Sequence, residues 1–266
     1  MFAAERIVCL TEETTETIYL LGEERRIAGI SGYTVRPPCA RKEKPRVSAF
    51  ISADIPKILA LEPDLVLTFS DLQADIVAAL IREGITVHAF NQRSIAGILD
   101  MIRLMGCFVG APDRADALAN TYAKRLAEIR DETNNFPFRP KVYFEEWNDP
   151  MISGIQWVSE LIAIAGGEDI FAELAMGKSA KERIVTPAQV IARAPDIIIG
   201  SWCGKKFSAT KTAARPGFDA IPAIRNGRLH EIKSPIILQP GPAALTDGLD
   251  ALRQIVTSPE STDVLQ

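Results

Sequence analysis

Residues 55–70, "IPKILALEPDLVLTFS", recur in altered form at residues 187–202, "PAQVIARAPDIIIGSW". Each copy begins with apolar residues at helical spacing, continues with a Pro-Asp pair and ends in a short apolar run. Proline stops a helix because it has no backbone N–H to continue the hydrogen-bond ladder. Apolar runs such as "LVLTF" and "IIIG" are typical of parallel strands that helices cover on both faces. Each copy therefore predicts a helix, a turn and a buried parallel strand.

The segments around each copy repeat the same order of elements. In the first half, "RIVCL" at 6–10 predicts a strand, and the helix after it ends at Gly22, a residue type that favours helix C-termini. In the second half, "KVYFEEW" at 141–147 predicts a strand, and the helix "WVSELIAIAGG" ends at Gly166 and Gly167. Each half thus alternates as β-α-β-α-β-α-β, which is typical of a doubly wound parallel sheet.

A long helical segment separates the two halves. Apolar residues recur at helical spacing from Ile95 to Met105 and, after Pro112, from Ala115 to Ile129. A helix of about 20 residues spans roughly 30 Å, which is long enough to link two lobes.

We therefore predict an α/β fold of two Rossmann-like lobes with parallel sheets, joined by a long bridging α-helix. The predicted domains are an N-terminal lobe at 1–93, a bridging helical segment at 94–137 and a C-terminal lobe at 138–266. The alternative is one continuous sheet whose halves merely resemble each other.

Composition and charge narrow the class of protein. Hydrophobic residues make up 47% of the chain and charged residues 24%, which suits a globular protein with a buried core. The net charge of −4 argues against a general nucleic-acid binder. No apolar run approaches the roughly 20 residues of a membrane-spanning helix. The N-terminus shows no secretory signal, so we expect a cytoplasmic protein, or a periplasmic one whose signal was removed.

The four cysteines are scattered and form no CxxC motif, and only His88 and His230 are present to assist them. We therefore predict no metal site. Scattered cysteines fit a reducing compartment slightly better than an oxidising one.

In open parallel sheets, ligands bind outside the carboxyl ends of the strands, and two facing lobes would form a cleft there. Trp147, Trp157 and Trp202 each fall just past a predicted strand or at the start of a helix. An indole offers a flat apolar face and an N–H donor to a ring-bearing ligand, although each could instead cap the core of its lobe. The candidate ligand-binding residues are Glu12, Tyr33, Phe69, Asn91, Arg93, Glu146, Trp147, Trp157, Trp202 and Lys205.

Candidate catalytic groups are few. Cys203 in "WCGKK" could be a reactive thiol, and Glu145 and Glu146 in "FEEW" could act as acid and base. Packing and solvation are the simpler interpretations of these residues. No phosphate-binding, hydrolase or zinc-protease motif occurs, so we predict no catalytic residue.

The chain resembles the class III substrate-binding proteins of bacterial ABC importers for cobalamin, haem and ferric siderophores, and is most similar to the cobalamin-binding branch. The matching phrases are "RIVCLTEETTETIYLLG", "IPKILALEPDLVL", "LIREGITVHAF", "ISGIQWVSELIAIAGGEDIF" and "IVTPAQVIARAPDIII". They run along nearly the whole chain. The resemblance implies two lobes, a rigid connecting helix and a ligand in a shallow cleft, faced by Tyr33 and the loops around Phe69, Trp147 and Trp202.

The resemblance also implies an ABC permease as partner, onto which a surface glutamate in each lobe docks. At these positions the chain has Pro56 and Ala188. The expected charge complementarity is therefore missing, and Asp54 or Glu182 could substitute only with a shifted geometry.

From these observations we predict non-catalytic binding of a small molecule, cobalamin-like or another large ring-bearing ligand, in the cleft between two lobes, without a resident cofactor. One alternative is a true importer subunit shown without its signal peptide. The other is an enzyme on the same fold that uses Cys203 or the Glu145–Glu146 pair.

Overall fold

The computed structural model describes residues 3–258 and forms two compact units. Unit 1 consists of Met1–Gln92 and Ala96–Ala123, and unit 2 consists of Arg93–Ile95 and Lys124–Gln266. The extreme ends of the predicted lobes, residues 1–2 and 259–266, lie outside the described residues.

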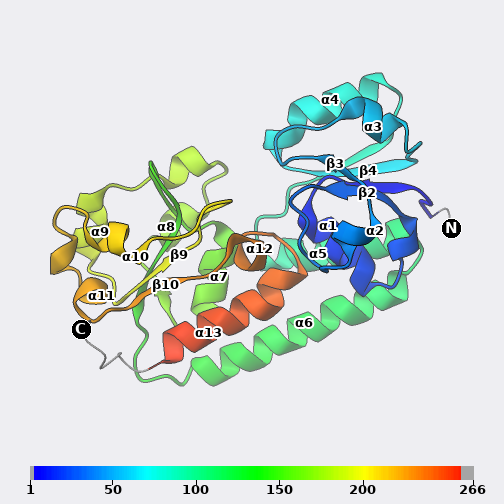
Figure 1. Cartoon of the computed structure of the whole chain (residues 1–266). Coiled ribbons are helices and arrows are strands. Elements are labelled where there is room, and N and C mark those ends of the chain that lie inside the picture. The colour runs from blue at the N-terminus through cyan, green and yellow to red at the C-terminus, as the bar shows by residue number, and fades with distance from the viewer. Residues whose placement is uncertain (1–2, 259–266) are drawn as a thin grey trace. The chain divides into compact units, whose positions relative to one another are not determined.

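The division between the units falls inside α6 (Pro112–Thr133), a single long helix (Figure 1). The predicted bridging segment is thus shared between the units rather than forming a body of its own. Two separate sheets are present, so the α/β prediction is confirmed and the alternative of one continuous sheet is wrong.

Within the described residues, unit 1 holds a five-stranded sheet in the order β3-β2-β1-β4-β5. Every neighbouring pair in it is parallel. The strands are β1 (Ile7–Cys9), β2 (Ile27–Ser31), β3 (Arg46–Ser48), β4 (Leu65–Phe69) and β5 (Val87–Phe90). The sheet is parallel because a helix returns the chain after most strands, so that each strand starts from the same edge.

Helices cover both faces of this sheet, with α3 and α4 on one face and α1 and α5 on the other (Figure 1). The helical segments are α1 (Glu12–Leu20), the 3₁₀ turn η1 (Glu24–Arg26), α2 (Ala40–Glu43), α3 (Ile55–Leu59), the 3₁₀ turn η2 (Asp71–Gln73), α4 (Ala74–Arg82) and α5 (Ile95–Val109). Double coverage explains why β4 is buried along its whole length, since no face of it meets water.

The repeated Pro-Asp pair has a backbone explanation. The residue before each pair adopts a positive φ, 47° at Glu62 and 46° at Ala194. Side chains other than glycine rarely adopt this left-handed conformation. In unit 2 it is the C-cap of α9 (Pro187–Arg193), and in unit 1 it follows the turn after α3; in both units it leads the chain into the following strand. The two halves thus share a turn as well as a sequence pattern.

The aspartates of the two pairs hold the start of a neighbouring strand. The Asp64 carboxylate accepts the backbone N–H groups of Glu5, at 2.6 Å, and of Arg6, at 3.0 Å. The Asp196 carboxylate accepts the N–H of Lys141 at 2.8 Å. Each aspartate therefore sets the register of the strand that opens its unit, which is a physical reason for the same pair to occur in both halves.

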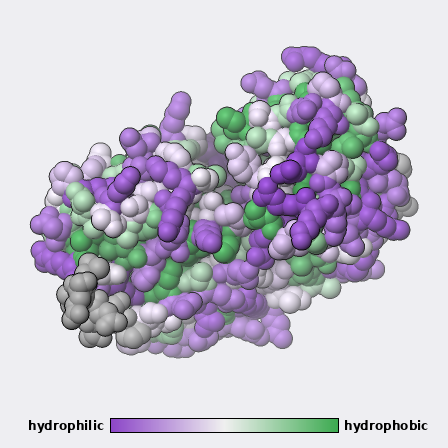
Figure 2. All heavy atoms as spheres, viewed as in Figure 1, coloured by the Kyte–Doolittle hydropathy of each residue, from purple (hydrophilic) through white to green (hydrophobic). Residues whose placement is uncertain are grey.

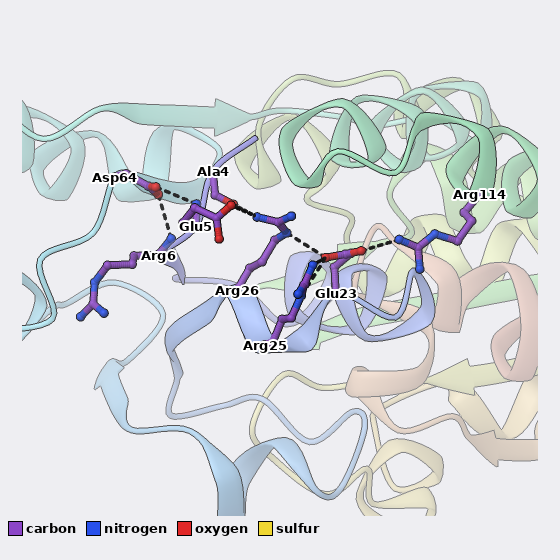
Figure 3. A network of polar contacts seen from close by, with 8 residues as sticks. All are labelled: Ala4, Glu5, Arg6, Glu23, Arg25, Arg26, Asp64 and Arg114. Carbon is purple, nitrogen blue, oxygen red and sulfur yellow. Dashed lines mark hydrogen bonds and ion pairs between the residues drawn. The ribbon is translucent and has the colours of Figure 1, made fainter. Parts of the chain in front are cut away.

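In unit 1, a polar network adjoins the start of β1 (Figure 3). The Glu23 carboxylate lies between Arg26, at 2.8 Å, and Arg114 of α6. Arg25 approaches the same carboxylate at 3.4 Å, and Arg26 also donates to the carbonyl of Ala4 at 2.9 Å. The network ties the N-terminal strand and η1 to the part of α6 that belongs to unit 1.

In unit 2 the strand order is β10-β9-β6-β7, with β8 paired to β6. The strands are β6 (Lys141–Asn148), β7 (Met151–Ser153), β8 (Glu168–Asp169), β9 (Ile197–Gly200) and β10 (Leu229–Glu231). β7 pairs antiparallel to β6, so one short antiparallel strand joins a sheet whose other pairs are parallel, as predicted. The reason is a short turn at Asp149 and Pro150, which folds the chain back as a hairpin.

The hairpin also corrects the predicted place of Trp147. Trp147 lies in β6 and pairs with Ile152 of β7, as the predicted strand at 141–147 implies, and not just past a strand as expected for all three tryptophans. Because β7 extends the ladder, β6 continues to Asn148.

Helices surround the second sheet as well. They are α7 (Gln156–Ile164), α8 (Ala172–Ala175), the 3₁₀ turn η3 (Ala180–Arg183), α9, α10 (Ala209–Ala213), the 3₁₀ turn η4 (Phe218–Ala220), α11 (Pro222–Arg225), α12 (Ser234–Ile237), the π-helical segment η5 (Ala244–Gly248) and α13 (Leu249–Thr257). Tyr143, Phe171 and Phe218 are fully buried in the core of this unit. In the described part of the chain, no helix is both long enough and apolar enough to span a membrane.

Candidate ligand surfaces at the strand ends

The parallel strands of unit 1 bring their following loops to one edge of the sheet. Glu12 follows β1, Tyr33 follows β2, Phe69 ends β4 and Asn91 follows β5. Four of the predicted residues therefore share this edge. Arg93, the next predicted residue, is half-buried and belongs to unit 2.

Exposed apolar side chains mark the same edge. Tyr33 is 53% exposed, Ile51 after β3 is 71% exposed and Leu72 after β4 is 59% exposed. On the face drawn in Figure 2, such apolar side chains are interspersed with hydrophilic ones. Sequence reasoning identified Tyr33 and missed Ile51 and Leu72. Ile51 was missed because β3 is a three-residue strand flanked by charged and small residues. The only available signal was an apolar residue in a segment otherwise typical of a loop.

The first turn of α1 is acidic and buried. Burial raises the pKa of Glu12 to about 8, with a further contribution from Glu13, and burial raises the pKa of Glu13 to about 7. Glu16 pairs with Arg36 at 2.7 Å. A carboxyl group that keeps its proton near neutral pH can donate a hydrogen bond.

In unit 2, three predicted residues come together. The Lys205 ammonium nitrogen lies 5.4 Å from the ring centre of Trp147 and 5.1 Å from that of Trp202. It also donates to the side-chain oxygen of Asn148 at 2.9 Å. Trp147 is half-buried and Trp202 is buried. We call Trp147, Trp202 and Lys205 the indole–lysine cluster; Trp147 lies near the carboxyl end of β6, and the other two follow the carboxyl end of β9.

A buried carboxylate lies beneath this cluster. Glu145 is fully buried and pairs with Arg215 through both oxygens, at 2.5 and 2.9 Å. It also accepts the Trp202 indole N–H at 3.0 Å and the Tyr143 hydroxyl at 3.0 Å. Burial of Tyr143, together with the nearby charge of Glu145 and the hydroxyl's bond to that carboxylate, raises the pKa of Tyr143. Glu145 thus orients the Trp202 ring.

The neighbouring glutamate has a similar structural role. Glu146 pairs with the buried Arg183 through both oxygens, at 2.5 and 3.1 Å, and Arg183 also donates to the carbonyl of Ser153. Both carboxylates of "FEEW" therefore hold strands and loops in place, which does not suit acid–base exchange with a substrate. Sequence reasoning could not find Arg183 and Arg215, because each lies far along the chain from its partner.

Trp157 lies in the core. It is 3% exposed, and its indole N–H donates to the carbonyl of Ile237 at 2.9 Å. A ring so deeply buried fits the alternative interpretation, in which the tryptophan caps the core of its unit. It leaves almost no indole surface on which a ligand could stack. The physical reason is the amphipathic face of α7, which turns this residue inward.

Cys203 is one of three exposed cysteines in the described residues, together with Cys39 and Cys107, and none of them forms a disulfide there. Within the described residues, no group of three or more histidine, cysteine, aspartate or glutamate side chains gathers to hold a metal ion.

Comparisons with known proteins agree with this architecture. The family described as "Periplasmic binding protein" matches residues 7–236. A vitamin B12-binding protein of Vibrio cholerae serotype O1 is 27% identical over 261 residues, which is 96% of this chain and 89% of that protein.

Two solved structures are similar over almost their whole lengths. The periplasmic haem-binding protein RhuT of Roseiflexus sp. RS-1 is 25% identical with a TM-score of 0.80, covering 96% of this chain and 100% of the other. The periplasmic vitamin B12-binding protein BtuF of Vibrio cholerae is 23% identical with a TM-score of 0.77, covering 96% and 98%. Since the family match spans most of the residues and the fold agrees, this chain belongs to the periplasmic binding protein family.

Proposed function

We propose that the protein binds a cobalamin-like molecule or another large ring-bearing ligand without changing it chemically. The indole–lysine cluster carries this proposal. Trp147 offers a half-buried indole at the carboxyl end of β6, where ligands of such sheets bind. Lys205 adds a positive charge beside that ring, which suits an acidic group on the ligand.

The strand ends of unit 1, taken by themselves, also carry groups that suit a ligand. Tyr33 is exposed there, and Glu12 can donate a hydrogen bond while its carboxyl group keeps its proton. A relative named as a vitamin B12-binding protein and a solved haem-binding protein support a large ring as the ligand class.

Equilibrium dialysis with cyanocobalamin and with haemin tests the proposal. We expect one of them to bind at micromolar concentration. The change Trp147→Ala should weaken binding by about tenfold through loss of ring contacts. Trp157→Phe is the matched control, because it alters a buried indole in the same unit and should leave binding unchanged. If the wild-type protein binds neither ligand and carries nothing bound when it is purified, the proposal is wrong.

A permease partner is a separate question. Pro56 in α3 and Ala188 in α9 are both exposed at the positions where the resemblance implies docking glutamates. Of the nearby acids, Asp54 caps α3 by accepting the Lys57 N–H at 3.0 Å, and Glu182 accepts the Ser179 hydroxyl at 3.0 Å. We propose ligand binding without glutamate-mediated docking. Stable association with a purified permease that depends on Asp54 or Glu182 would contradict this.

For cellular location, the sequence and the family support different compartments. All four cysteines lie in the described part and form no disulfide there; the sequence-based expectation of a reducing compartment rests on their scattered spacing. The family supports the periplasm. Fractionation of cells that express the natural gene distinguishes them, and release of the protein by osmotic shock would contradict the cytoplasmic prediction.

A further inference from the structure

A buried glutamine connects three of the segments that end the strands of unit 1. Gln73, the last residue of η2, has no exposed surface. Its side-chain oxygen accepts the Phe69 N–H at 3.0 Å. Its side-chain nitrogen donates to the carbonyl of Phe50, at 2.8 Å, and to that of Leu10, at 3.3 Å. One amide thus joins the ends of β1 and β4 to the loop after β3.

Each of these contacts is costly to lose. The three backbone groups lie where loops leave the sheet, and a buried N–H or carbonyl that loses its partner is strongly unfavourable. An amide is also well matched to the task, because it supplies both a donor and an acceptor. A carboxylate or an apolar side chain of the same length cannot satisfy all three groups.

The segments that Gln73 joins carry the exposed apolar side chains. Ile51 directly follows Phe50, and Leu72 directly precedes Gln73. The loop between Phe69 and Gln73 contains Ser70, whose φ of 58° and ψ of 175° are rarely adopted by residues other than glycine. Such a conformation persists only where surrounding contacts enforce it, and the bond from Phe69 to Gln73 closes the loop around it.

We propose that Gln73 is a positioning residue that presents Ile51 and Leu72 as an apolar contact surface for the ring of the ligand; this rests on the proposed function. Ligand contact explains why two large apolar side chains remain 71% and 59% exposed on loops whose backbone is fixed. A fixed loop has less freedom to lose when the ligand binds, so affinity depends on the buried amide.

The test compares affinity with loop order in Gln73→Met. We expect the dissociation constant for the ligand that binds the wild type to rise about tenfold. Hydrogen exchange should accelerate at the Phe69 amide and at Ala49, whose N–H bonds to the Ser52 carbonyl at 2.8 Å. The rest of the sheet should keep its protection. Ile51→Ala and Leu72→Ala should weaken binding to a similar degree without accelerating exchange.

Gln189→Met is the matched control, because Gln189 accepts the Thr186 N–H at 2.8 Å in the first turn of α9. It should cost stability but leave affinity unchanged. If Gln73→Met does not fold, Gln73→Glu, which keeps the acceptor for Phe69 and loses the donor, takes its place with the same expected direction.

Unchanged affinity in a less stable Gln73 variant would reduce Gln73 to a purely structural residue and overturn the inference. Unchanged affinity in both alanine variants would overturn it too. Failure of the wild type to bind either ring ligand would instead refute the proposed function, and the exchange measurement would still show whether Gln73 orders these loops.

Discussion

Replacing Glu145 by glutamine removes one buried negative charge and leaves its partner in place. The Arg215 side chain is only 17% exposed and bonds to both oxygens of Glu145, which has no exposure at all. Breaking a buried ion pair by removing one partner costs about 3–5 kcal/mol, because the remaining charge is poorly solvated. We expect Glu145→Gln to lower the free energy of unfolding of unit 2 by this amount.

Urea unfolding followed by tryptophan fluorescence measures the effect. All three tryptophans lie in unit 2, so the fluorescence reports on this unit, whereas circular dichroism reports on both. With a slope of about 2 kcal/mol per molar urea, the fluorescence midpoint should fall by about 1.5–2.5 M. Glu231→Gln is the matched control: Glu231 is exposed and accepts the Phe207 N–H at 2.9 Å, and glutamine keeps that acceptor.

The double variant Glu145→Gln with Arg215→Met provides the decisive comparison. Removing both charges should recover much of the lost stability, because no unpaired charge then remains in the interior. A shift of less than about 0.5 M for Glu145→Gln, or a double variant less stable than either single one, would refute the assignment of this pair as the buried support of the cluster.

Other predictions concern the polar groups of both units. Asp64→Asn and Asp196→Asn should each destabilise their own unit by about 1–3 kcal/mol in urea unfolding monitored by hydrogen exchange, with the larger loss at Asp64, which accepts two N–H groups. The raised pKa values of Glu12, about 8, and Glu13, about 7, mean that these two groups bind more protons in folded unit 1 than in the unfolded chain between about pH 4.5 and 8, and the lowered pKa of His88, a single group, offsets only part of this excess. Its stability should therefore fall as the pH rises from 4.5 to 8, and less steeply in Glu13→Gln; a flat wild-type profile would contradict this. A thiol reagent should label the three exposed cysteines of the native protein at similar rates, and Cys9 only after unfolding, because burial raises its pKa to about 12; a much faster reaction at Cys203 would favour the enzyme alternative.

Some elements were predictable because their signal is local. β4 and β9 have the bounds that the apolar runs indicated, and α1 ends next to Gly22, which has a φ of 66°. A wholly apolar run after a helix stop has few other stable placements in a globular chain. β3 and β7 were missed because each has three residues and is held mainly by its neighbours, and no periodicity develops over so short a length.

The candidate site, too, was predictable only where its signal is local in the sequence. That Trp202 and Lys205 follow a strand could be inferred from chain order alone. That Trp202 is held by Glu145, which lies 57 residues away, could not. Nor could the burial of Trp157 be distinguished beforehand from exposure at a helix start, since an indole suits both environments.

The sequence by itself determined that the chain alternates helices and buried strands in two similar halves, because helix stops, glycine turns and apolar runs act within a few residues. The tertiary structure alone decided which polar groups are held together, such as Gln73 with three loop segments and Glu145 with Arg215. A hydrogen bond or an ion pair depends on distance in space, and the backbone between its partners imposes no pattern that the residues at either end reveal.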